Sequence, residues 1–490
     1  MTTASPFKTF ISRFSHFLSG NLLTKLLGFI TLPVLTRLLT TEQYGILSLA
    51  TTTIMLWVVF AKAGLSEGIF RYYRSYSETQ EKLIEFSSTV LIRGLILSVL
   101  TFGVYFVMLF VFKEKLKIEN EYVACFVIIA FFILIRPLDN IVSNLMIVTG
   151  KTIFLNVIGF MAKIVSFCLS LFFFFYIVKG IYGYLIGSLL SEVVLTIVLF
   201  YWFFKNYTID VRKSSWPLAG KLIKFGAPLL LTELSYLLLS YADRYMIIAY
   251  RGEDALGIYS VGYNIAMYIS DGLIFALSYT IVPIFVEMYE KKGRQETEAF
   301  LNKCMYYVLV SVIIMTFGYF PIARDLFTTL ASNKYGDAAV FSPIILISNF
   351  ILGLSTNMLN AGLYLEKKSV RILVNMLIAL IINIILNVIL IPQYGVIGAA
   401  IATLLACIAL AILTIQSSFK YISYNKFDIK KLSYYVALSI IMVVIVTQIN
   451  TAKDWVSLIA KVATGVVIVI SGVLFQEKEL LAAFRSYTKL

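Results

Sequence analysis

The chain has 490 residues, of which 60% are hydrophobic and only 14% are charged, and its net charge is +14. A soluble protein of this length has too little interior to bury so much apolar surface, so the composition excludes a soluble domain and predicts an integral membrane protein. The Lys and Arg residues lie in short clusters between apolar runs, which is typical of membrane loops and argues against nucleic acid as a partner. The single histidine, His16, excludes a histidine-based zinc motif.

Apolar runs long enough to cross a bilayer follow one another along the whole chain. They predict helices near residues 14–38, 44–64, 88–112, 122–148, 152–178, 181–204, 221–250, 256–286, 299–321, 341–365, 371–391, 394–419, 432–450 and 455–475. The predicted fold is therefore an all-α polytopic membrane protein with about fourteen transmembrane helices. No loop is long enough for a soluble domain, so the function must reside in the membrane helices.

The distribution of Lys and Arg over the loops predicts the orientation. With the N-terminus inside, about 25 of them fall in one set of loops and about nine in the other. Because cytoplasmic loops carry the excess of positive charge, both termini are expected in the cytoplasm and the chain in the inner (cytoplasmic) membrane. An even number of helices is consistent with this orientation.

Two short motifs recur at a nearly constant offset. Glu42–Ser48 is similar to Asp254–Ser260, and Gly180–Gly183 is similar to Gly395–Gly398, at offsets of about 212 to 215 residues. The repeats predict two parallel six-helix halves, an architecture in which a transported substrate binds between the halves near the middle of the membrane. The predicted divisions are a six-helix bundle at 1–206, a second at 207–420, and two additional helices with a tail at 421–490.

Among the ionisable residues inside the predicted spans, ten are singled out as candidates for function. At the centre of a membrane helix each costs about 2.5–3.5 kcal/mol, so each must face water, a partner or a ligand. The cations are Lys25, Arg93, Arg136, Lys163 and Arg244, and the acids are Asp139, Glu192, Glu233, Asp243 and Asp271.

Lys25 and Lys163 lie near mid-span with no acid within one helical turn. Asn21 shares a helix face with Lys25, and Asn156 shares one with Lys163. Polar and small residues beside a lysine indicate the wall of a wet cavity, and a cationic cavity favours an anionic ligand such as phosphate or pyrophosphate.

The other cations are candidates for the same substrate-binding cavity, each with a structural alternative. Arg93 and Arg244 could instead extend to a membrane interface, and Arg136 could pair with Asp139 three residues later.

The five acids are candidates for binding a coupling ion, Na⁺ or H⁺, because carboxylates inside transporters commonly have this role. The alternative for Glu192, Glu233, Asp271, Asp139 and Asp243 is structural pairing with the cations. No other cofactor and no structural metal is expected.

Several segments together resemble the Wzx-type oligosaccharide flippases of bacterial polysaccharide synthesis. These flippases share a superfamily with MATE-type multidrug exporters and lipid II flippases. The matching segments are Leu32–Leu47, Asp243–Ile247, Ala255–Ser260, Leu363–Lys368 and Ile391–Ala400.

The resemblance implies two six-helix bundles in a V around a central cavity, and no enzymatic activity. It implies movement of an undecaprenyl-pyrophosphate-linked oligosaccharide from the inner to the outer leaflet by ion-driven alternating access. Its partners would be the lipid-linked glycan, the bilayer and other polysaccharide assembly proteins. A monomer is expected because one chain supplies both halves. Related lipid II flippases have arginines in the first helix, where this chain has Lys25.

Two alternatives remain open. A MATE-like multidrug or cation antiporter would have the same fold, although cationic drugs would favour acidic walls over lysines. A membrane glycosyltransferase or polysaccharide polymerase belongs to another class, and it would need a larger outer loop and no internal repeat.

Overall fold

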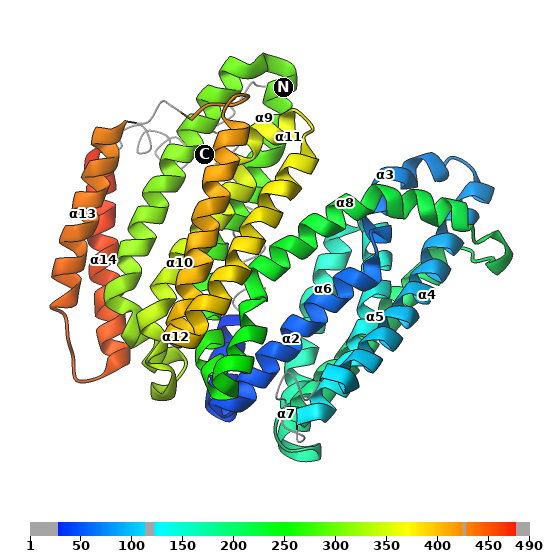
Figure 1. Cartoon of the computed structure of the whole chain (residues 1–490), viewed down its shortest axis with the longest axis horizontal. Coiled ribbons are helices and arrows are strands. Elements are labelled where there is room, and N and C mark those ends of the chain that lie inside the picture. The colour runs from blue at the N-terminus through cyan, green and yellow to red at the C-terminus, as the bar shows by residue number, and fades with distance from the viewer. Residues whose placement is uncertain (1–27, 113–121, 425–427, 477–490) are drawn as a thin grey trace. The chain divides into compact units, whose positions relative to one another are not determined.

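The computed structural model describes residues 28–112, 122–424 and 428–476, apart from five side chains between 275 and 280. All regular structure in these ranges is helical (Figure 1). The helices are α2 (Thr41–Lys62), α3 (Leu65–Tyr76), α4 (Gln80–Phe112), α5 (Val123–Val148), α6 (Thr152–Phe172), α7 (Ile181–Asn206), α8 (Trp216–Tyr241), α9 (Asp243–Leu330), α10 (Ala338–Leu354), α11 (Ala361–Leu365), α12 (Ser369–Ser418), α13 (Ile429–Thr447) and α14 (Asp454–Gln476). Short 3₁₀ or π turns accompany several of them.

Helix lengths fit membrane crossings once the turns inside α9 and α12 are taken into account. Eleven continuous helical segments are long and apolar enough to cross a bilayer, and a shorter apolar helix covers Gly28–Leu38. Positive φ angles at Gly252 and Gly293 divide residues 216–330 into three crossings instead of two, and Gly395 divides α12 into two. Eleven plus two gives thirteen crossings in the described residues, and Gly28–Leu38 is the described end of the first of the fourteen predicted helices.

The chain packs as two compact units. The N-terminal unit comprises residues 38–260 and 372–399, and the C-terminal unit comprises the described residues within 1–37, 261–371 and 400–490. These units reflect packing, whereas the predicted division at 206 and 420 reflects the sequence repeat, so that division stays a prediction.

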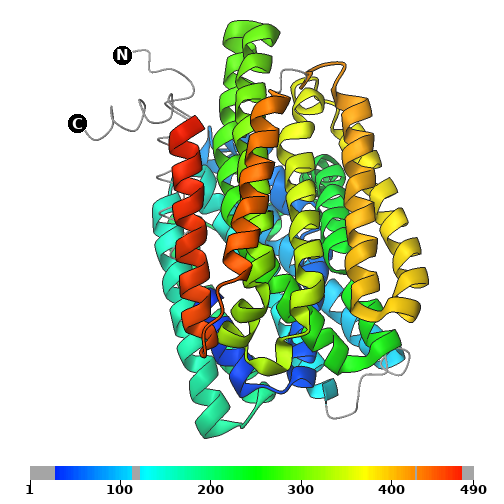
Figure 2. The same ribbon diagram turned by 90° about the vertical axis from the view of Figure 1, so that its left-hand side faces the viewer.

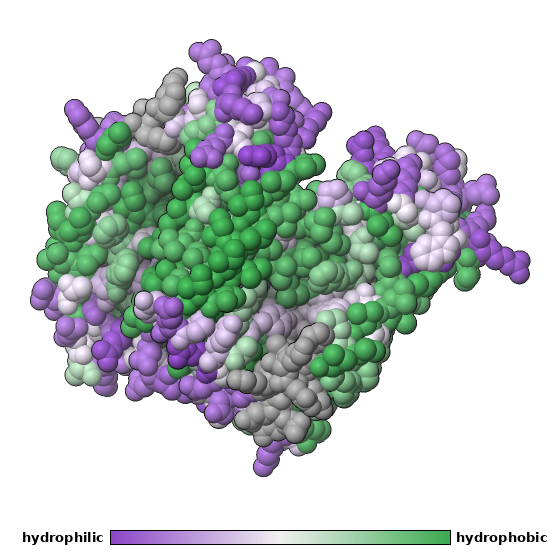
Figure 3. Space-filling view, viewed as in Figure 1, coloured by the Kyte–Doolittle hydropathy of each residue, from purple (hydrophilic) through white to green (hydrophobic). Residues whose placement is uncertain are grey.

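Each unit has its own apolar core and an apolar outer surface. Phe86, Val142 and Leu222 belong to the core of the N-terminal unit, and Phe285 and Leu301 to that of the C-terminal unit. Apolar side chains cover the surface over α10 and α12, and polar side chains gather at the two ends of these helices (Figure 3). This is the distribution that a bilayer selects. In Figure 2, α13 and α14 run side by side in the same unit.

The repeated motifs adopt equivalent local structures. Gly180 and Gly395 have positive φ angles of 86° and 59° and each precedes a membrane helix. Gly45 and Gly257 pack against each other's helices: a Cβ on Gly45 would lie 2.3 Å from the Glu253 carbonyl oxygen, and one on Gly257 would lie 1.9 Å from that of Thr41. The repeat is therefore structural, and its glycines allow α2 and α9 to cross at backbone contact.

Candidate functional site

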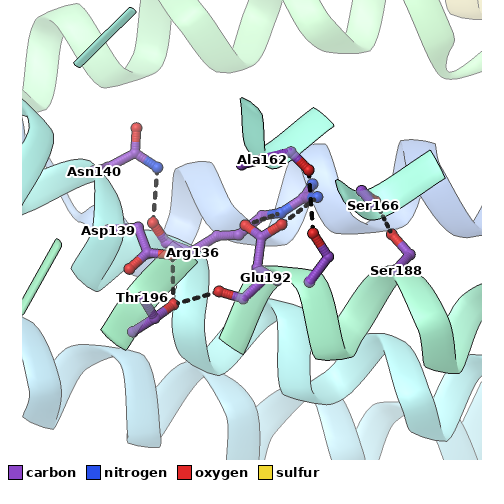
Figure 4. A network of polar contacts seen from close by, with 9 residues as sticks. Arg136, Asp139, Asn140, Ala162, Ser166, Ser188, Glu192 and Thr196 are labelled. Carbon is purple, nitrogen blue, oxygen red and sulfur yellow. Dashed lines mark hydrogen bonds and ion pairs between the residues drawn. The ribbon is translucent and has the colours of Figure 1, made fainter. Parts of the chain in front are cut away.

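Charged residues at mid-membrane depth meet where α5, α6 and α7 pack in the N-terminal unit (Figure 4). Arg136 lies near the middle of α5, and its Nε and Nη2 donate hydrogen bonds of 2.9 and 3.2 Å to the two carboxylate oxygens of Glu192 on α7. The guanidinium also lies 5.0 Å from the ring centroid of Phe132. Arg136 therefore forms its ion pair with Glu192, and the alternative of a pair with Asp139 is wrong.

Asp139 lies one turn further along α5 and is only 6% exposed. Its Oδ2 accepts a 2.8 Å hydrogen bond from Thr196 of α7, while its buried Oδ1 has no hydrogen-bond partner. Asp139 thus lies beside the Arg136–Glu192 pair and has no ion pair of its own among the described residues.

Lys163 lies on the neighbouring helix, and no hydrogen bond or ion pair holds it within the described part of the chain. The carbonyl of Ala162, the preceding residue, accepts a hydrogen bond from Ser191, which precedes Glu192. Lys163 therefore lies at the level of the Arg136–Glu192 pair. We call Arg136, Asp139, Lys163, Glu192 and Thr196 the α5–α7 site.

Helix α6 presents two different exposed faces. Ile153, Val157 and Met161 form an apolar face with exposed fractions of 82, 52 and 54%. Asn156 and Lys163, almost two turns apart, are exposed on a second face about a third of the way round the helix, where a Cβ on Gly159 would meet nothing within 4 Å. The apolar face suits lipid and the polar face suits water, so Lys163 does not have to share the lipid-facing side.

A second buried charge cluster joins α2, α8 and α9. Arg244 is 4% exposed, donates a 2.8 Å hydrogen bond to Thr52 and lies 4.7 Å from the ring centroid of Tyr241. Asp243 is also buried and accepts a hydrogen bond from Tyr259. Because Thr52 lies at the middle of α2, Arg244 is held at mid-membrane depth, and the alternative of extension to an interface does not describe it.

Glu233 is paired with a lysine that sequence analysis did not single out. Lys62, at the end of α2, donates 2.8 Å hydrogen bonds to both carboxylate oxygens of Glu233 on α8 and lies 3.7 Å from Glu67 of α3. Lys62 is the last residue of α2 and falls inside the predicted span 44–64. Two carboxylates share this one cation.

Arg93 holds the linker between α7 and α8. It donates a 2.9 Å hydrogen bond to the Ser214 carbonyl, and its guanidinium lies 4.2 Å from the ring centroid of Trp216. Thr89 on the same helix accepts from the Ser215 amide. These contacts favour a structural role for Arg93. Its part in substrate binding stays a prediction.

The remaining predicted residues are separate from these clusters. Asp271 is half-buried on α9 in the C-terminal unit. Asn21 and Lys25 lie outside the described residues, so their place in a cavity wall stays a prediction.

The C-terminal unit contains an ion pair that the sequence did not reveal. Lys461 of α14 is 6% exposed and donates a 2.7 Å hydrogen bond to Asp325 of α9, which also accepts one of 2.8 Å from Ser457. Asp325 was expected in an outer loop because helix nine was predicted to end at residue 321. That boundary is wrong, because α9 continues to Leu330. The sequence feature that could have revealed this ion pair is Lys461, a lysine inside an apolar run.

Beside this ion pair lies an apolar cavity of about 420 Å³ in the C-terminal unit. Its walls come from the helix at Gly28–Leu38, from α9 and from the α13–α14 pair, and Lys461 lines it too. Its apolar lining includes Phe29, Ile269, Met315, Ile322, Met442 and Val466. A cavity with such walls accommodates hydrocarbon and excludes ions.

Comparison with solved structures identifies the class of the fold. The lipid II flippase MurJ, in its inward closed conformation, is similar to this chain with a TM-score of 0.75 at 16% identity, over 95% of this chain and 99% of that one. An inward-facing multidrug resistance MATE family transporter of the MOP superfamily has a TM-score of 0.61 at 17% identity, over 82% of this chain and 96% of that one. The fold is therefore that of the multidrug/oligosaccharidyl-lipid/polysaccharide exporter superfamily.

Sequence comparison identifies the family. Residues 13–289 match the family described as polysaccharide biosynthesis protein, and residues 228–389 match the MatE family. The chain belongs to the polysaccharide biosynthesis protein family. It is 22% identical over 346 residues to a protein of the Lsg locus of Haemophilus influenzae, covering 68% of this chain and 79% of that one. An uncharacterized membrane protein of Methanocaldococcus jannaschii, MJ1068, is 24% identical over 379 residues, 71% of each chain.

Proposed function

We propose that this membrane protein is a transporter, which moves undecaprenyl-pyrophosphate-linked oligosaccharide from the cytoplasmic to the outer leaflet of the inner membrane, driven by an ion gradient. The observation that carries the proposal is Lys163, an exposed lysine without an ion pair at mid-depth, on the polar face of α6. A transporter of cationic drugs has no use for an unpaired lysine in its path, whereas a pyrophosphate needs one.

Two further observations support a lipid-linked anion. The apolar cavity of the C-terminal unit offers a lining suited to part of a polyprenyl chain. The family description and the structural similarity to a lipid II flippase favour a lipid-linked glycan as cargo over a free ion.

The orientation in this proposal has both termini in the cytoplasm. In the described part of the N-terminal unit, the loops and helix ends on one side carry nine Lys and Arg residues besides Lys62, and those on the other carry Lys179 and Arg251. The nine are Arg71, Arg74, Lys82, Lys151, Lys205, Arg212, Lys213, Lys221 and Lys224. The positive-inside rule supports placing this basic end on the cytoplasmic side.

The test measures which leaflet holds the lipid-linked glycan in cells that lack the gene and carry one variant. Lys163→Ala should leave the glycan on the cytoplasmic leaflet, and Lys163→Arg should restore most of the movement. Lys179→Ala is the matched control, because Lys179 is an exposed lysine at the end of the same helical segment. Normal movement in Lys163→Ala would remove this residue from the site. Absence of accumulation in the deletion strain itself would favour the drug exporter instead.

The proposed coupling ion, H⁺ or Na⁺, binds at Asp139, the carboxylate of the α5–α7 site that has no ion pair among the described residues. Reconstituted protein should move glycan faster when a proton or sodium gradient is imposed, and Asp139→Asn should abolish that acceleration. Glu290→Gln, which alters an exposed acid of α9, should leave it unchanged. Equal rates with and without either gradient in the unaltered protein would contradict coupling while leaving the flippase proposal intact.

A further inference from the structure

Helix α3 is a short amphipathic helix at the end of α2. Leu65, Gly68 and Ile69 are buried, and a Cβ on Gly68 would lie 2.8 Å from the Leu222 side chain of α8. Phe70, Arg71 and Arg74 lie on the exposed side. Twelve residues are too few to cross a bilayer, so this helix is suited to the interface between hydrocarbon and water.

The first turns of α8 extend the exposed surface of α3. Lys221 and Lys224 are exposed, and the Lys221 ammonium lies 4.7 and 5.9 Å from the ring centroids of Tyr72 and Tyr76. Phe225 and Trp216 are exposed as well, at 38 and 54%. We call Arg71, Arg74, Lys221 and Lys224, with the aromatic residues between them, the interfacial collar.

The four cations of the collar have no acidic partner within the described residues. Nearby acids are already occupied, because Glu67 approaches Lys62 and Glu81 pairs with Lys213 at 3.2 Å. The collar therefore presents four uncompensated positive charges where one membrane crossing ends and the next begins. Arginine and lysine interleaved with Tyr, Trp and Phe are the combination that binds at the headgroup level of a bilayer.

We propose that the interfacial collar binds the phosphates of anionic phospholipids in the leaflet that surrounds it. The cations attract the phosphates, and Trp216, Phe70 and Phe225 extend into the region between headgroups and acyl chains. The aromatic residues favour a lipid surface as the partner. An acidic protein would contact the cations but would have no need of exposed aromatic residues beside them. The proposal concerns bilayer lipid, so it is independent of what the transporter carries.

Trp216 provides a reporter inside the collar. In a variant with Trp57→Phe, Trp202→Phe and Trp455→Phe, it is the single tryptophan. The protein is placed in phosphatidylcholine vesicles that contain, in equal amounts, brominated phosphatidylglycerol or brominated phosphatidylcholine. Brominated phosphatidylglycerol should quench Trp216 more strongly. A double variant, Arg71→Gln with Arg74→Gln, removes two of the cations. It should lower the preference for the anionic lipid roughly fivefold for each charge removed.

The control variant is Lys291→Gln with Lys292→Gln, which removes two exposed lysines that already pair with Glu287 and Glu296. It should keep the full preference, and Arg71→Lys with Arg74→Lys should keep most of it. If the single-tryptophan variant does not fold, spin-labelled phosphatidylglycerol and phosphatidylcholine give the same comparison on protein with all four tryptophans. Equal quenching by both lipids, or an unchanged preference in the Arg71 and Arg74 variant, would overturn the proposal. So would displacement of the anionic lipid by a polyglutamate peptide at low concentration, which would identify an acidic protein as the partner.

Discussion

The ion pair between Arg136 and Glu192 allows a quantitative test of the α5–α7 site. Replacing Glu192 with Gln keeps the shape of the side chain but removes its charge, leaving Arg136 without its counter-ion at mid-membrane depth. Breaking a fully buried pair costs about 3–5 kcal/mol. Because Arg136 is 33% exposed on its side chain, part of that cost is screened by water, and we expect a loss of about 1.5–3 kcal/mol.

A double-mutant cycle separates the pair from the local effect of each substitution. Unfolding free energies are measured in mixed micelles for Arg136→Gln, Glu192→Gln and the double variant, and the expected coupling energy is about 1–2 kcal/mol. Arg294 and Glu298 provide the matched control, since their Nε–Oε1 distance is also 2.9 Å but they lie at the surface. Their coupling should not exceed about 0.5 kcal/mol. Equal coupling at the two pairs would refute the claim that burial in the membrane strengthens the first.

Three further substitutions follow from the packing. Gly45→Val places side-chain atoms against an α9 carbonyl and should destabilise by about 1–3 kcal/mol in the same unfolding assay, whereas Gly103→Val meets open space and should not. Asp325→Asn leaves the buried Lys461 without an anion, at a cost of about 3–5 kcal/mol; trypsin should then cut faster in the α13–α14 loop, and Lys461→Met combined with Asp325→Leu should restore resistance. Gly395→Ala must adopt a φ of 59° and should lower stability by about 1–2 kcal/mol, so an unchanged melting temperature would show that the turn rearranges.

The number of membrane crossings could be predicted from the sequence because it depends on the length and hydropathy of single segments. Fourteen apolar runs sufficed: the turns at Gly252 and Gly293 fall between runs that sequence analysis already separated, and Gly395 is the second residue of the run predicted at 394–419. The repeat could be predicted as well, because Gly45 and Gly257 must lack a side chain for the same local reason, contact between two backbones.

The pairing of charges could not be predicted, because it depends on which helices are neighbours and at what depth. Arg136 lies three residues from Asp139 in sequence but reaches Glu192, 56 residues away. Lys62 binds Glu233 across 171 residues. Local spacing favours the nearest acid, whereas the packed helices offer a better-oriented one.

Two lysines show why an intramembrane charge alone does not identify a ligand site. Lys461 and Lys163 both lie within membrane helices, and both would be equally costly against lipid. Lys461 is 6% exposed and neutralised by Asp325, with a further hydrogen bond from Ser457 to the same carboxylate, so its charge serves to hold α14 against α9. Lys163 is exposed, has no acidic partner among the described residues and lies on a polar face of α6 distinct from its apolar face. A positive charge of that kind persists in a membrane protein only if something other than the protein compensates it, and a water-filled path for an anionic headgroup meets that requirement.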